Sequence, residues 1–171
     1  EDEINGFVFD PVTGRFTAEN EPGNSDRKGI EFNGSWLMIE NLSLNVAYTW
    51  LDATEEDSFT GEDYDEIRRS EHIGSATLNW GFLGNRANLN ISVDYNGKQD
   101  DFFFPPVPPF QERVELDSFT LVHIAASYQL SSRLRLHARL ENAFDEDYEE
   151  VYGYVAPGQS IYAGLRYSFG G

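Results

Sequence analysis

The last twelve residues, Ser160 to Gly171, read SIYAGLRYSFGG, and apolar side chains occupy every second position along most of this stretch. The apolar series is Ile161, Ala163, Leu165, Tyr167 and Phe169. Side chains that repeat with a period of two lie on one face of a β-strand. The stretch therefore predicts a strand with one continuous apolar face and an aromatic residue near its end.

The same alternation recurs throughout the chain, for example in RLRLHARLEN from Arg133 to Asn142. The other alternating segments are Ile4–Phe9, Ile30–Trp36, Leu42–Trp50, Gly74–Trp80, Ala87–Tyr95 and Thr120–Leu130. Most are near the ~9–11 residues with which a tilted strand crosses a bilayer. The sequence predicts an all-β fold of about eight antiparallel strands, with no helix longer than a turn or two.

Composition excludes several classes of protein. The 171 residues carry a net charge of −18 and no cysteine, which argues against a nucleic-acid-binding protein, disulfides and thiolate metal sites. Mean hydropathy is −0.50, and no stretch approaches the ~18 apolar residues of a membrane helix. Residues 1–3 lack the basic start of a signal peptide, so we expect a mature chain or a piece of a longer one.

The connections between the predicted strands alternate in length. Tight turns are expected at Glu40–Asn41, Leu83–Asn85 and Ser131–Ser132, long connections at Asp52–Arg69, Gly97–Asp117 and Asn142–Gln159, and a shorter one at Asp10–Gly14 on the long-loop side. Short turns at one end and long loops at the other are typical of an outer-membrane β-barrel. Two interpretations remain open at this point: a membrane barrel with its apolar face in lipid, and a soluble β-sandwich with that face in a core.

Aromatic residues gather near both ends of the predicted strands. They are Trp36, Trp80, Tyr128, Tyr167 and Phe169 toward the short turns, and Tyr48, Trp50 and Tyr95 toward the long loops. Two aromatic belts are a feature of proteins at bilayer interfaces. The belts favour the barrel over the sandwich, and in such a barrel the short turns would be periplasmic.

Three segments resemble parts of TonB-dependent outer-membrane receptors. RKGIEFNGSW and ENLSLNVAYTWLDA resemble a strand pair of that family, and LENAFDEDYEEVYGYVAPGQSIYAGLRYSF resembles its C-terminal end. The family stretch N-[LA]-F-D-x-x-Y-E is matched at Asn142–Glu149, and VYGY at 151–154 is similar to cobalamin and siderophore receptors. The resemblance implies a 22-stranded barrel around a plug, located in the bacterial outer membrane.

The resemblance also implies what this chain is within such a receptor. Residues 1–171 are expected to be the C-terminal portion of the barrel domain, without the plug and its TonB box. The parent protein would take up iron-siderophore complexes or cobalamin and would not be an enzyme. Its partners would be lipid and lipopolysaccharide, TonB through the plug, the remaining strands, and the barrel assembly machinery. That machinery would read a C-terminal signal comprising Tyr162, Leu165, Tyr167 and Phe169. The alternative is a self-contained eight-stranded barrel that acts as an anchor or adhesin.

Two groups of residues are candidates for contacts inside or above the barrel. Arg133, Arg135 and Arg139 form a basic row on the polar face of one strand, expected to pair with carboxylates such as Glu141 or to meet the plug or an anionic ligand. Phe102, Phe103 and Phe104 precede PPVPPF at an expected loop apex. Exposed aromatic clusters of this kind mark binding surfaces, although they can also pack against neighbouring loops.

Metal and catalytic signals are weak. Asp57, Asp63 and Asp65 are calcium candidates in an acidic loop, but they match no EF-hand spacing, and a solvated acidic loop is the simpler interpretation. The carboxylates at 145–150 are interpreted in the same way. His72, His123 and His137 are scattered, with the last two predicted on the polar face, and no nucleophile–base arrangement is evident.

Overall fold

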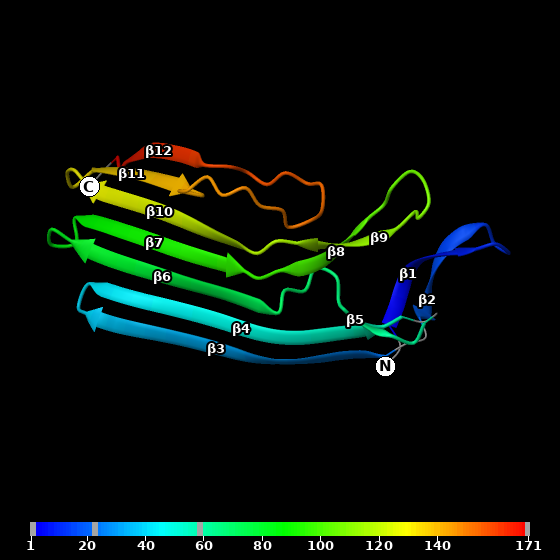
Figure 1. The fold of residues 1–171 in the computed structure, drawn as a ribbon. Coiled ribbons are helices and arrows are strands. Elements are labelled where there is room, and N and C mark those ends of the chain that lie inside the picture. Colours follow the sequence, from blue (N-terminus) through cyan, green and yellow to red (C-terminus); the bar gives the residue numbers. More distant parts are fainter. Residues whose placement is uncertain (1–2, 22–23, 58–59, 170–171) are drawn as a thin grey trace.

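The computed structural model describes residues 3–21, 24–57 and 60–169, and within these ranges the chain forms strands and no helix (Figure 1). The strands are β1 (Glu3–Asp10), β2 (Arg15–Glu21), β3 (Ser25–Ile39), β4 (Leu42–Glu56), β5 (Asp63–Asp65), β6 (His72–Phe82), β7 (Ala87–Asn96), β8 (Gln99–Phe103), β9 (Glu112–Leu116), β10 (Phe119–Gln129), β11 (Leu134–Glu141) and β12 (Ser160–Tyr167). The described part of the chain holds no helix long and apolar enough to span a membrane.

One eight-stranded antiparallel sheet contains most of the chain. Its order is β12-β11-β10-β7-β6-β4-β3, with the short β5 paired to β4. Seven of the eight predicted strands lie in this sheet, which confirms the all-β architecture of about eight strands. Within the described ranges, β3 and β12 have one neighbour each, so the sheet is open and is not closed upon itself.

The eighth predicted strand has a different partner from the others. Ile4–Phe9 lies within β1, but β1 pairs with β2 in a separate hairpin that the alternation did not predict. The predicted connection Asp10–Gly14 is the turn of this hairpin, and the hairpin lies at the long-loop end of the molecule (Figure 1).

The strand register places every apolar series on the same face of the sheet. One row of direct partners crosses the whole sheet and is entirely apolar: Trp36, Leu44, Leu78, Ile91, Ile124, Leu140 and Ile161. The neighbouring row on the opposite face is polar: Ser35, Asn45, Thr77, Ser92 and His123. A one-residue slip of any strand would exchange the two faces, so the register itself confirms the predicted apolar and polar faces.

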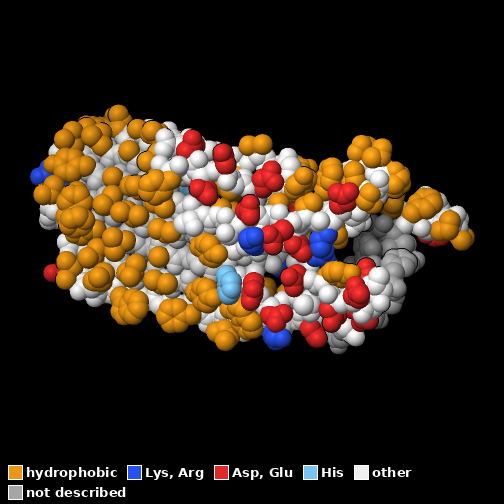
Figure 2. Space-filling model, in the orientation of Figure 1, with side chains coloured by type: hydrophobic (Ala, Val, Ile, Leu, Met, Phe, Trp, Pro, Cys, Tyr) orange, Lys and Arg blue, Asp and Glu red, His pale blue; other side chains and the backbone are white. Residues whose placement is uncertain are grey.

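The sheet has very little core. Among the described residues only five apolar side chains are buried, and they are Ala53, Ala87, Leu116, Phe119 and Leu121. Large apolar side chains such as Trp36, Ile161 and Leu165 are exposed on a single-layered sheet. Figure 2 shows hydrophobic side chains covering the short-turn half, whereas charged side chains gather toward the long loops. A soluble sandwich would bury this face against a second sheet, so the arrangement is that of a barrel wall whose apolar face meets lipid.

The two ends of the sheet differ as predicted. The connections at residues 40–41, 83–86 and 130–133 are tight turns at one end, next to the C-terminus (Figure 1). The connections between β4 and β6, β7 and β10, and β11 and β12 are long and lie at the other end. Two of these long connections contain strands of their own, because β5 extends the sheet beside β4 and β8 pairs with β9 as a hairpin.

Candidate functional site

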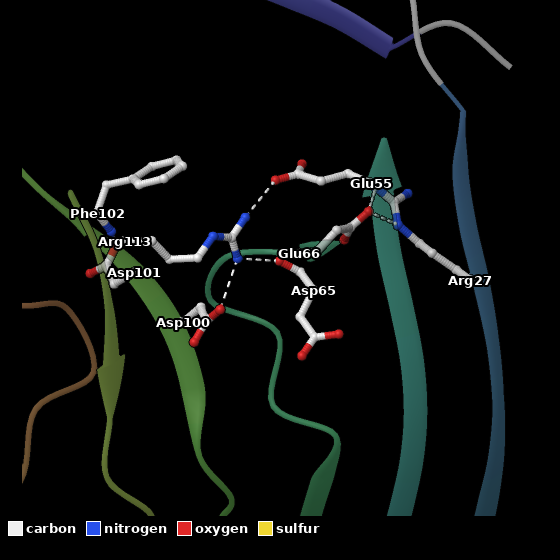
Figure 3. Close-up of polar contacts among 8 residues, drawn as sticks. All are labelled: Arg27, Glu55, Asp65, Glu66, Asp100, Asp101, Phe102 and Arg113. Carbon is white, nitrogen blue, oxygen red and sulfur yellow. Dashed lines mark hydrogen bonds and ion pairs between the residues drawn. The ribbon is translucent and has the colours of Figure 1, made fainter. Parts of the chain in front are cut away.

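The long-loop end carries a network of ion pairs and hydrogen bonds, here called the rim network, most of which is drawn in Figure 3. It consists of Arg27, Glu55, Asp65, Glu66, Asp100, Asp101, Phe102 and Arg113, together with Arg68 and Arg69. These residues come from β3, β4, β5, β8 and β9 and from the segment that follows β5. The members of the network therefore join two of the long connections to each other and to the sheet, and Asp101 adds a contact to the third.

Arg113 of β9 is the residue with the most partners in this network. Its Nη1 donates to the carboxylate of Asp100 at 2.8 Å and to the backbone oxygen of Asp65 at 2.6 Å. Its Nη2 donates to Glu55 at 3.4 Å. The guanidinium also lies over the rings of Phe102 and Tyr64, at 5.5 Å and 5.2 Å from the ring centroids. The planar guanidinium can combine several hydrogen bonds with aromatic stacking, which lysine cannot.

Asp101 of β8 is 0% exposed and is the one fully buried side chain in the described residues. Its Oδ1 accepts hydrogen bonds from Nε of Arg68 at 2.9 Å and from the backbone N–H of Phe102 at 2.8 Å. Its Oδ2 accepts from the backbone N–H of Tyr152 at 2.8 Å. Burial alone would raise the pKa of Asp101, but these three donors outweigh it and hold the pKa below its ordinary value of 3.8. One carboxylate thus joins β8, the β5–β6 connection and the β11–β12 connection.

Glu66 is buried and links the far side of the network. It accepts from Nε of Arg27 at 2.6 Å and pairs with Arg69 at 3.4 Å. The backbone N–H of Glu66 donates to the carbonyl of Ala53 at 2.9 Å. Because Arg27 belongs to β3 and Ala53 to β4, these contacts attach the β5–β6 connection to the edge strand of the sheet and its neighbour.

The sequence suggested that the three consecutive phenylalanines lie at the loop apex, but only the last of them lies beyond the strand. Phe102 and Phe103 are in β8, half-buried, and contact Arg113 and Tyr152. Phe104 follows the strand and is 64% exposed. The exposed apolar tip of the β8–β9 hairpin is therefore Phe104 with Val107 and Phe110. Phe102 and Phe103 differ from the prediction because the hairpin extends the pleated structure up to Phe103 and supplies ring partners there.

The β11–β12 connection is fixed at its base by Asn142, which is buried and has a φ of 46°. Asparagine tolerates this left-handed conformation better than most residues. Its side-chain oxygen accepts from the N–H of Glu146, and its amide donates to the carbonyl of Glu146, both at 2.9 Å. Further along, Tyr148 packs on Phe119 with ring centroids 4.6 Å apart. The stretch matched at Asn142–Glu149 is thus a structural motif that shapes the loop.

A polar cavity of about 400 Å³ lies beside the rim network. Its lining is mostly charged and consists of Leu51, Asp52, Ala53, Asp65, Arg69, Glu71, Lys98, Gln99, Asp100 and Glu115. Lys98 is paired with Glu115 at 2.6 Å, which raises the pKa of the ammonium group. With more carboxylates than cations, the cavity suits water and polar groups and does not suit an apolar ligand.

The predicted basic row lies at the opposite, short-turn half. Arg135 and Arg139 are on the polar face of β11, where their direct partners on β12 are Arg166 and Tyr162. Arg139 pairs with Glu141 at 3.2 Å, as the sequence suggested, and lies over the ring of Tyr162 at 4.3 Å from its centroid. Arg133 was predicted on this strand as well, but it precedes β11 and lies in the tight turn, because β11 begins at Leu134.

The calcium and histidine candidates are not brought together. In the described ranges no three His, Asp or Glu side chains form a group that could hold a metal. Asp57 accepts from the N–H of Thr60 at 2.8 Å, and Asp63 and Asp65 lie in β5. His72 contacts the hydroxyl of Tyr48 at 2.8 Å on the apolar face, whereas His123 and His137 lie on the polar face as predicted.

The residues of the expected C-terminal signal lie on and beyond β12. Leu165 and Tyr167 are on the apolar face, opposite Leu136 and Leu134, while Tyr162 is on the polar face. Phe169 follows the strand, is exposed and contacts the ring of Tyr167 at 4.8 Å.

Comparison with known proteins agrees with this architecture. Residues 3–143 match the family model described as TonB dependent receptor-like, beta-barrel. A vitamin B12 transporter BtuB from Photobacterium profundum is 34% identical over 142 residues, which are 83% of this chain and 21% of that protein. Its counterpart from Vibrio cholerae is 28% identical over 154 residues, covering 88% and 23%. The chain thus spans between a fifth and a quarter of the length of these curated relatives.

Solved structures show the same fold at low sequence identity. The pyoverdine outer membrane receptor FpvA from Pseudomonas aeruginosa superposes with a TM-score of 0.78 at 15% identity, covering 98% of this chain and 25% of that one. The siderophore receptor PiuA from Acinetobacter baumannii superposes with a TM-score of 0.71 at 15% identity, covering 97% and 24%. The chain therefore belongs to the β-barrel family of TonB-dependent receptors, non-enzymatic transport proteins of the bacterial outer membrane.

Proposed function

We propose that this chain is the C-terminal part of the barrel of a TonB-dependent receptor that imports cobalamin or an iron-siderophore complex. The two sheet edges support a larger parent, because unpaired backbone groups are not tolerated in hydrocarbon and β3 and β12 each need another strand. For the same reason an eight-stranded barrel closed on itself, acting as an anchor or adhesin, is the less favoured alternative.

The observation that carries the proposed function is the combination of a fixed rim network with an exposed apolar loop tip. Phe104, Val107 and Phe110 are between 62% and 65% exposed. They stand on the β8–β9 hairpin, whose base is held by Arg113 and Asp101. A pre-organised base reduces the entropy that binding would otherwise cost. Exposed aromatic side chains above it suit a large, partly apolar ligand.

Cobalamin is the first ligand to test, because the relative with 34% identity is a vitamin B12 transporter. The siderophore receptors are similar at 15% identity and inform the fold. The partners proposed for the whole receptor are TonB through a plug, the remaining barrel strands, the assembly machinery, and lipid with lipopolysaccharide around the wall.

The experiment measures binding and uptake of radiolabelled cobalamin and of ferric siderophores by cells that express the whole receptor. The double substitution of Phe104 and Phe110 by Ser is expected to weaken binding at least about fivefold, since buried aromatic anchors typically contribute more than ~1 kcal/mol. Val12→Ser is the matched control, because Val12 is 92% exposed in the turn of the β1–β2 hairpin.

The outcomes separate the alternatives. Uptake of cobalamin alone selects the cobalamin receptor, and uptake of a ferric siderophore alone selects the siderophore receptor. Uptake of neither, together with an intact mass near 19.4 kDa for the protein in outer membranes, would overturn the transporter and favour the small barrel. Equal binding by the double variant and the control would remove the loop tip from the ligand site.

A further inference from the structure

A cation with no carboxylate partner lies at the short-turn end of the barrel wall. Arg86 is the last residue of the tight turn between β6 and β7 and is exposed. Among the described residues its guanidinium has no ion pair, although the chain carries 30 acidic residues against 12 Lys and Arg. Its contacts are instead with Tyr128 and with the backbone oxygen of Gln129.

The side chain of Tyr128 holds this guanidinium in place. Nη2 of Arg86 donates to the hydroxyl of Tyr128 at 3.0 Å, and the guanidinium carbon is 5.4 Å from the ring centroid. Nε and Nη2 both reach the carbonyl of Gln129 at 3.4 Å. Because the hydroxyl of Tyr128 accepts from Arg86, its own proton is available to a further acceptor. The Nη1 group of Arg86 has no acceptor in the described part of the chain.

The strand register fixes the depth and the face of this pair. Tyr128 is the direct partner of Ala87 and Leu136, in a row that continues to Leu165, and this row belongs to the lipid-facing side. Aromatic side chains mark the same end of the wall, including Trp80, which packs on Phe82 with centroids 4.7 Å apart. Tyrosine and tryptophan rings of this kind lie at the level of lipid headgroups.

Lys28 shows what a cation with a protein partner looks like on the same chain. Its Nζ lies 2.9 Å from the carboxylate of Asp52, at the long-loop end. At the short-turn end, the described residues provide no such carboxylate for Arg86. The membrane itself supplies an anion at that level, since the headgroup of every phospholipid in the periplasmic leaflet carries a phosphate.

We propose that Arg86 and Tyr128 form a binding site for the phosphate of a phospholipid headgroup in the periplasmic leaflet of the outer membrane. Nη1 of Arg86 and the hydroxyl of Tyr128 donate to the phosphate oxygens, and the acyl chains extend from there along the apolar face toward Ala126 and Ile124. Charge-assisted hydrogen bonds from arginine to phosphate are among the stronger ones in proteins. The site adds a lipid contact to the wall and is independent of the nutrient that the receptor imports.

The test uses the whole receptor in nanodiscs of phosphatidylethanolamine and phosphatidylglycerol, followed by native mass spectrometry of the lipids retained in mild detergent. Arg86→Gln is expected to lower phospholipid retention about fivefold, the effect of one basic residue near a membrane surface. Tyr128→Phe keeps the ring and loses the donor, so we expect a smaller loss, about twofold. The control is Arg166→Gln, because Arg166 follows Leu165 of the same row but lies on the opposite, polar face.

The results distinguish a phospholipid site from a site for free anions. Selective loss of retained phospholipid in Arg86→Gln, with Arg166→Gln like the wild type, supports the proposal. Equal phospholipid retention by the wild type, Arg86→Gln and Arg166→Gln would overturn it. Displacement of the lipid by millimolar inorganic phosphate, or equal thermal protection by phosphate alone, would also overturn it by showing a site for free anions.

Discussion

The two halves of the sheet are held together by different physical means. In the short-turn half, apolar rows face outward from a single layer, and no second layer packs against them in the described part of the chain. One such row consists of Trp80, Leu89, Ala126, Ala138 and Ala163. In the long-loop half, carboxylates and guanidinium groups connect loops that are far apart in sequence, as Arg113 does with Glu55. The first half relies on lipid as its apolar solvent, and the second supplies its own polar partners.

This difference indicates where each kind of substitution should matter. A charge placed on the wall loses its hydration in lipid, so its cost depends on depth and face. A polar group removed from the rim leaves its partners unsatisfied, so its cost depends on their burial. Four substitutions, taken from the largest expected effect to the smallest, test this division.

The largest effect is expected at the centre of the wall. Ile91 is the direct partner of Leu78 and Ile124, near the middle of three neighbouring strands. Ile91→Arg should destabilise the barrel by ~2–4 kcal/mol, the cost of arginine on the lipid face at the bilayer midplane. Reversible unfolding of the whole receptor in lipid bilayers measures this cost.

Ser92→Arg is the matched control, because Ser92 is the next residue along β7 and faces the polar side between Thr77 and His123. A wider polar interior accommodates the added charge with a much smaller loss of stability. An equal loss of stability in both variants would contradict the assignment of the two faces.

The next effect is expected at the buried carboxylate of the rim. Asp101→Asn replaces one accepting oxygen by a donor. The fewest hydrogen bonds are lost when the amide nitrogen takes the Oδ2 position, which costs the bond from Tyr152, because Oδ1 accepts from both Arg68 and Phe102. We expect a local destabilisation of about 1–3 kcal/mol, typical of a buried group left without its partner. Hydrogen exchange of the β11–β12 connection should accelerate, while exchange in β7 stays unchanged. Unchanged exchange at Tyr152 would show that Asp101 does not hold this loop.

The same carboxylate gives the rim a dependence on pH. The pKa of Asp101 is lowered in the folded chain from its ordinary value of 3.8. A lowered pKa means that the stabilisation is complete above the ordinary value and is lost as the pH falls below it and through the folded-state pKa. Loop exchange in the wild type should therefore rise in strongly acidic buffer, and Asp101→Asn should lack this acid-induced change.

A smaller effect is expected at the base of the last loop. Asn142→Ala removes both hydrogen bonds with Glu146 and forces alanine to adopt a φ of 46°. The expected cost is about 1–2 kcal/mol. Asn142→Gly is the comparison, because glycine accepts the left-handed conformation and loses only the hydrogen bonds. Thermal unfolding of both variants measures the difference, and identical values would show that conformational strain contributes nothing.

The strands of the wall could be predicted from local pattern, because the apolar side chains of each strand repeat with a period of two. The alternation of Leu134 to Leu140 with its arginines located β11 to within one residue at either end. The register could not be predicted in the same way, since it depends on which strands are neighbours. The strands β2, β8 and β9 were not predicted because their sequences, such as QDDFF and ERVEL, are charged and lack a clear apolar face.

The rim could not be predicted because its contacts connect loops that are distant in sequence. Nothing local distinguishes Asp101 from Asp100, yet one is fully buried among donors and the other pairs with Arg113. Asn142 gave a signal, since it begins the family stretch, but the pattern could not show that its role is to turn the chain. For the same reason the sequence could not decide whether the phenylalanines form an exposed binding surface or pack against neighbouring loops, because ring partners such as Tyr152 lie in another loop.

The smallest effect is expected where the wall meets the headgroups. Leu136 is the third residue of β11, is opposite Tyr128, and shares the lipid-facing row with Leu165. Leu136→Arg should cost only about 0–1 kcal/mol, because arginine near the interface can extend its charge into the headgroup region. Unfolding in lipid, with Ile91→Arg beside it, measures the contrast between two depths on one face. A cost at Leu136 as large as that at Ile91 would place the hydrocarbon boundary beyond Tyr128. Arg86 would then lie too deep to meet a phosphate, so the depth profile tests the lipid site as well as the wall.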